Sequence, residues 1–72
     1  MKNSVYYRVL SVIWKGYEDE IIDNKKYSED TISEQAEEYV EEIGENGDPS
    51  LYEENDDIWI VADFRLWLEA NV

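Results

Sequence analysis

The residues most able to do chemistry in this chain are carboxylates, and they are crowded into one stretch. Between Lys26 and Arg65 the sequence has fourteen Asp and Glu residues and no Lys, Arg or His. Carboxylates coordinate metal ions, pair with Arg and Lys side chains, and serve as acids or bases in catalysis. Because like charges placed together oppose compaction, a stretch of one sign indicates a basic partner.

Six glutamates in this stretch recur at spacings of three and four residues: Glu34, Glu37, Glu38, Glu41, Glu42 and Glu45. On a helix this spacing places them in rows on the solvent side, with about 5.4 Å between successive turns. A rigid row of carboxylates can occupy the Arg and Lys side chains that otherwise hold a phosphate backbone. An acidic helix face is usually only a solvated face, but here no Lys supplies the i,i+4 pairs that stabilise one.

The acidity also continues beyond the glutamate row. The residues expected to extend it are Glu53, Glu54, Asp56 and Asp57, and Tyr52 or Trp59 is expected to add a contact. Together with the six glutamates they form the predicted partner-binding site.

An enzyme is not expected. The chain has no His and no Cys, so it lacks the commonest general base, a thiolate nucleophile and the usual zinc ligands. Carboxylate pairs such as Glu53 and Glu54 would need a cleft that holds them at a defined separation. The acidic loop that starts at Asp48 lacks the residue order of an EF-hand, although a loosely bound divalent ion remains an alternative to a solvated loop. We therefore predict no catalytic residue, no metal and no cofactor.

Size and composition indicate a single small domain over residues 1–72. Hydrophobic residues make up 43% and aromatic residues 14% of the chain, which is too apolar for a disordered acidic tail. A net charge of −13 disfavours direct binding to nucleic acid or to an anionic membrane. The segment 1–4 does not resemble a secretory signal and no apolar run is long enough to cross a membrane, so we expect a cytoplasmic protein.

Two strands are predicted before the helix. Apart from Arg8 and Ser11, residues 5–14 are apolar or aromatic at both odd and even positions, which fits a strand covered on both faces. A tight turn at Lys15 and Gly16 would then lead to an edge strand over residues 17–23, with Arg8 opposite Asp23.

The predicted helix has the clearest pattern in the chain. Ser28 is a suitable N-cap, Tyr27 and Ile32 fit a hydrophobic staple, and a capping box at 31–34 leaves the start uncertain by about one turn. Gly44 is expected just past its end. The residues predicted to form its buried stripe are Ile32, Ala36, Tyr39, Val40 and Ile43.

The C-terminal third is predicted to be a loop followed by a strand. Residues 45–57 are rich in turn formers, with Leu51 and Tyr52 expected to pack onto the core. From Ile58 onward every second residue is apolar, which favours a long strand, with a short helix after Asp63 as the alternative. The expected fold is α+β: a small antiparallel sheet of two or three strands in β-β-α-β order, with one acidic amphipathic helix on one face.

These features together favour a non-enzymatic inhibitor that mimics the DNA phosphate backbone and blocks the basic groove of a nucleic-acid-binding protein, such as a nuclease. In compact size, lack of cysteine and extreme acidity the chain resembles phage-encoded anti-restriction and anti-CRISPR proteins, a functional class rather than one family; this resemblance would place it in the host cytoplasm. The alternative is an acidic interaction module or homodimeric adaptor, which pairs through sheet faces or edges and binds a basic protein without mimicry. An exposed edge beside Trp59 would favour it.

Overall fold

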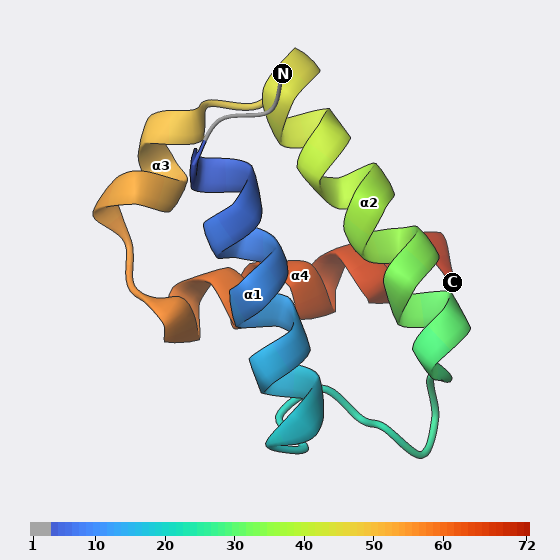
Figure 1. The fold of residues 1–72 in the computed structure, drawn as a ribbon. Helices are drawn as coiled ribbons and strands as arrows, with labels where there is room; N and C mark the ends of the chain where they lie inside the picture. Colours follow the sequence, from blue (N-terminus) through green and yellow to red (C-terminus); the bar gives the residue numbers. More distant parts are fainter. Residues whose placement is uncertain (1–3) are drawn as a thin grey trace.

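A computed structural model describes residues 4–72, and these residues form four helices (Figure 1). The helices are α1 (Ser4–Glu18), α2 (Glu29–Glu45), α3 (Pro49–Glu54) and α4 (Asp57–Asn71). No strand occurs over residues 4–72, so the expected α+β fold with a sheet is wrong. Residues 1–3, on which the expected lack of a secretory signal partly rests, lie outside the described residues.

Helix α1 packs against all three other helices. In Figure 1 it lies in front, with α2 and α3 on opposite sides of it and α4 crossing behind. Helix α2 also contacts α4. The side chains that meet between these helices form one buried core, to which every helix contributes.

The strand expected over residues 5–14 is instead most of α1. Its buried side chains are Val5, Val9, Val12 and Ile13, which follow the helical period. Odd and even positions are both mostly apolar in this segment. A strand covered on two faces and a helix with a broad apolar stripe therefore give the same sequence pattern here. Burial also outweighs the weak helix propensity of β-branched residues, which costs less than about 0.7 kcal/mol per residue.

The turn at Lys15 and Gly16 and the edge strand after it are also absent. Gly16 lies inside α1 against α4, where an added Cβ would be 3.0 Å from Cγ2 of Val61. Helix α1 instead ends at Glu18, and Glu20 in the turn after it has a left-handed φ of 62°. The backbone N–H of Ile21 donates to the Gly16 carbonyl at 2.9 Å. Buried Ile22 then anchors the connection to α2.

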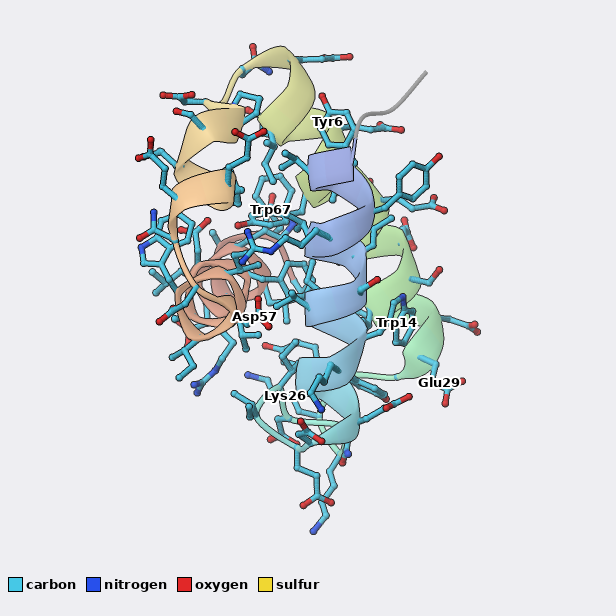
Figure 2. The ribbon with its side chains drawn as sticks, turned by 60° about the vertical axis from the view of Figure 1, so that its left-hand side comes forward. Tyr6, Trp14, Lys26, Glu29, Asp57 and Trp67 are labelled. Atoms are coloured by element: carbon cyan, nitrogen blue, oxygen red, sulfur yellow. The ribbon has the colours of Figure 1, made fainter. Side chains whose placement is uncertain are left out.

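Helix α2 confirms most of what its sequence predicts. The Oγ of Ser28 accepts a hydrogen bond from the backbone N–H of Thr31 at 3.2 Å, and all five residues of the predicted stripe are buried. Gly44, however, does not follow the helix, because α2 continues to Glu45. Its small size serves packing instead, since a Cβ there would collide with the hydroxyl of Tyr6, which Figure 2 shows at the first turn of α1.

The loop predicted over residues 45–57 contains the short helix α3. Asp48 caps this helix, with Oδ1 accepting from the backbone N–H of Ser50 at 3.0 Å, and Pro49 occupies the first helical position. Of the two residues expected to pack inward, Tyr52 is buried and Leu51 is 46% exposed.

The long C-terminal strand is likewise wrong, because residues 57–71 form α4. Ile60, Phe64 and Leu68, each four residues apart, are buried. Ile58 and Leu66 belong to the same alternating set but are 78% and 64% exposed. An every-second-residue pattern thus contains two every-fourth-residue rows that lie on opposite sides of a helix. The alternative of a short helix after Asp63 describes only part of α4.

Candidate functional site

The six glutamates predicted to bind a partner are all exposed and share one side of α2. We call Glu34, Glu37, Glu38, Glu41, Glu42 and Glu45 the α2 acidic face. At about 100° per residue they cover roughly 140° of the helix circumference, opposite the buried stripe. The helix is about 25 Å long at ~1.5 Å per residue, so the face is an elongated, one-sign surface.

Among residues 4–72, no basic side chain forms an ion pair with this face. The ion pairs over residues 4–72 join Arg8 to Asp57 and Lys15 to Asp19, and neither involves α2. The last turn of α2 contains Glu42 and Glu45 but no basic residue. Carboxylates at a helix C-terminus oppose the helix dipole, typically by about 0.3–1 kcal/mol each. The arrangement therefore costs stability.

The second group of predicted carboxylates does not prolong the α2 acidic face in a straight line. Glu53 and Glu54 lie on α3, on the other side of α1 from α2 (Figure 1), and both are exposed. Asp56 caps α4, with Oδ1 accepting from the backbone N–H of Trp59 at 2.9 Å. Asp57 follows it in the first turn of α4. These residues form a separate acidic edge.

Arg8 ties this edge to α1. Its Nη2 lies 3.1 Å from Oδ1 of Asp57 and donates to the carbonyl of Asn55 at 2.9 Å, while Nη1 donates to the carbonyl of Tyr52. A guanidinium at the C-terminal end of α3 satisfies carbonyls that have no partner inside the helix. The predicted pairing of Arg8 with Asp23 is therefore replaced by an ion pair to Asp57, whose role is at least partly structural.

The two aromatic residues predicted to contact a partner are placed differently. Tyr52 is 8% exposed, so its ring belongs to the core. Trp59 is half-buried and packs edge-on against that ring, with centroids 5.3 Å apart. Only Trp59 retains accessible surface for a contact.

A buried polar cluster joins α2, α3 and α4, and no motif in the sequence indicates it. The Tyr39 hydroxyl donates to Oδ2 of Asp63, and the Tyr52 hydroxyl lies 3.3 Å from that same oxygen and from the Tyr39 hydroxyl. Burial, reinforced by the neighbouring Asp63, raises the pKa of Tyr39 above its ordinary value. Burial is also the main cause of the raised pKa of Tyr52. Both phenols therefore stay protonated, and able to donate a hydrogen bond, above the pH at which an exposed tyrosine ionises.

An exposed apolar row on α4 is the other feature that was not predicted from the sequence. It consists of Ile58, Ala62, Leu66 and Ala70, all exposed and spaced four residues apart. Neither α1 nor α2 covers it, because both pack on the opposite side of α4. A row of this kind on a small domain is typical of an interaction surface.

Nothing over residues 4–72 groups three or more potential metal ligands in a metal-binding arrangement. Within the same residues, none of the helices has the length and apolar character needed to cross a bilayer. Comparison with protein-family models, with curated proteins and with solved structures gives no match to this chain.

Proposed function

We propose that this protein is a non-enzymatic inhibitor that mimics the DNA phosphate backbone and occupies the basic groove of a nucleic-acid-binding protein. The observation that carries the proposal is the α2 acidic face: six exposed carboxylates on one side of a single helix, with no ion pair to a described cation. Charge complementarity would speed association and make binding sensitive to salt. An inhibitor of the phage anti-CRISPR or anti-restriction kind, acting in the host cytoplasm, has these properties.

Stability alone does not account for the α2 acidic face. Glu34 and Glu38, like Glu38 and Glu42, are i,i+4 neighbours of the same sign, and such pairs destabilise a helix by about 0.2–0.5 kcal/mol each. Solubility requires a net charge of only about 2–8 for a small domain, against −13 here. A surface that costs stability and exceeds the need for solubility is best explained by binding.

The proposal is tested by removing charge from the α2 acidic face without changing its shape. One variant replaces Glu34, Glu38, Glu41 and Glu45 with Gln. The matched control replaces Glu18, Asp19, Glu20 and Glu69 with their amides, so both variants lose four negative charges from the net −13. Each is used to capture a partner from a lysate of the cells in which the protein acts, followed by washes at increasing salt. We expect the α2 variant to release the partner at much lower salt than the control.

Equal retention of the partner by the two variants would show that net charge, and not the α2 acidic face, determines binding. Circular dichroism should show the same helix content for both, because all eight side chains are exposed.

The exposed apolar row of α4 favours a second candidate function, an acidic interaction module that forms a homodimer. Ile58 and Leu66 are 78% and 64% exposed, and Arg65 and Glu69 flank them on the same helix. Two copies of α4 could pack through these every-fourth-residue rows, the commonest way in which helices interdigitate. Sizing chromatography with light scattering distinguishes the candidates. A dimer that becomes a monomer when Ile58 and Leu66 are replaced with Ser supports the module, and a monomeric wild type excludes it.

A further inference from the structure

A cavity of about 180 Å³ lies between the C-terminal half of α2, α3 and the middle of α4. Its walls include three aromatic side chains, Tyr39, Tyr52 and Trp67, and two carboxylates, Asp63 and Glu42. Glu42, Asn46 and Gly47 in its lining are exposed, so the cavity opens to solvent. Its volume is sufficient for the end of one long side chain.

The aromatic walls of the cavity are fixed in place. The ring of Tyr39 meets the rings of Trp67 and Tyr52 at steep angles, 66° and 79°, with centroids 5.5 and 6.0 Å away. The indole Nε1 of Trp67 donates to Oε1 of Gln35 at 3.1 Å, which sets the orientation of the indole. These rings pack edge-to-face and form a rigid aromatic wall, and a cation over the face of a Trp or Tyr ring is attracted by the ring electrons.

The carboxylates give the cavity a negative charge that the described residues do not neutralise. Asp63 is half-buried, its Oδ2 is held by the tyrosine hydroxyls, and no ion pair over residues 4–72 includes it. Glu42 is exposed, and its Oε2 accepts a hydrogen bond from Asn46 at 3.1 Å. A half-buried carboxylate among aromatic rings is poorly solvated and gains more from a cation than an exposed one does.

We infer that this cavity binds the guanidinium of an arginine side chain from a partner protein. A guanidinium is planar, stacks on aromatic faces and directs a rigid fork of N–H donors at a carboxylate, whereas an ammonium is a strongly hydrated point charge. This inference rests on the proposed function, which supplies the basic partner protein. It adds that one arginine side chain of that partner is held in the cavity. Arginines inserted into such pockets are frequent hot spots of interfaces.

The test uses a small probe and needs no partner. Nα-acetyl-L-arginine amide is titrated into the ¹⁵N-labelled chain of 72 residues, and the indole N–H resonance of Trp67, assigned with W67F, is followed. The citrulline analogue, which has the same shape but no charge, and the lysine analogue are titrated in parallel. We expect the arginine probe to shift the Trp67 resonance with at least tenfold higher affinity than citrulline and severalfold higher affinity than lysine.

Variants locate the binding within the cavity. D63N should weaken the arginine probe at least tenfold and E42Q severalfold, while E37Q, an equal change of charge on α2 outside the cavity, should leave it unchanged. If D63N does not fold, the comparison of arginine affinity between E42Q and E37Q tests the inference. Citrulline or lysine binding as well as arginine, or E42Q matching E37Q, would overturn the inference. Neither result bears on the α2 variant described above, because Glu34, Glu38, Glu41 and Glu45 do not line this cavity.

Discussion

The hydroxyl of Tyr39 on α2 donates a hydrogen bond to Oδ2 of Asp63 on α4. The two residues are 24 positions apart in the chain. The bond joins α2, which carries the α2 acidic face, to α4. Tyr39 is 4% exposed, so most of its side chain is buried in the core. The carboxylate and the phenol therefore help to hold α2 in position.

Replacing Tyr39 with Phe should destabilise the domain by about 1.5–3 kcal/mol, the usual range for a hydrogen bond to a charged group. The midpoint and slope of urea unfolding measure the change. Tyr7→Phe is the control, because Tyr7 is 60% exposed. A loss no larger than that of the control would show that the Tyr39–Asp63 bond contributes little.

Stability should fall at alkaline pH because of the same cluster. The folded state raises the pKa of Tyr39 and Tyr52 above the ordinary tyrosine value of 10.0. Below pH 10 both states keep the phenols protonated, and the stabilisation is fully present. As pH rises further, the unfolded chain releases these protons first, and stability falls by up to about 1.4 kcal/mol per pH unit for each phenol.

Thermal unfolding between pH 8 and 12 measures this loss, with the Tyr39→Phe, Tyr52→Phe double variant as the comparison. The double variant should lose less stability across the range. Parallel curves for the two proteins would contradict the assignment.

A lysine in the α2 acidic face should improve folding and impair binding. Glu38→Lys removes like-charge pairs with Glu34 and Glu42 and places a cation four residues after Glu34, the favourable order. We expect a gain of roughly 0.5–1 kcal/mol on the basis of these pair energies. The same variant should retain its partner only at reduced salt. Improved stability with undiminished binding would mean that the face is merely a solvated surface.

Glu20 offers a separate test of how α1 ends. Its φ of 62° is left-handed, a conformation that costs a non-glycine residue roughly 1 kcal/mol and suits glycine at the end of a helix. Glu20→Gly should therefore leave stability unchanged or raise it, whereas Glu18→Gly, in the last turn of α1, should lower it by up to about 1 kcal/mol. Similar losses in both variants, measured by chemical unfolding, would argue against this end for α1.

The sequence was sufficient to predict α2 because its cap, its stripe and its polar face all indicate the same structure. Ser28 and Ile43 mark the two ends of a pattern that only a helix satisfies. The α2 acidic face follows directly, since it is the complement of the buried stripe.

Helices α1 and α4 were not predictable from periodicity because their apolar residues also satisfy the period of a strand. In α4, Ile60 and Leu66 look equivalent in an alternating pattern, yet the first is fully buried and the second is exposed. Length was the available signal, since runs of ten or more residues are long for a strand. The hydrogen-bonded cluster around Asp63 could not be predicted from the sequence, because it forms only when α2, α3 and α4 pack together.

The most direct test of the central claim is competition between this protein and DNA for its captured partner. The wild-type protein, immobilised with the partner bound, is washed at constant ionic strength with double-stranded DNA or with an equal charge of free glutamate. If the α2 acidic face replaces a phosphate backbone, DNA will release the partner and glutamate will not. A partner that stays bound at saturating DNA would contradict mimicry.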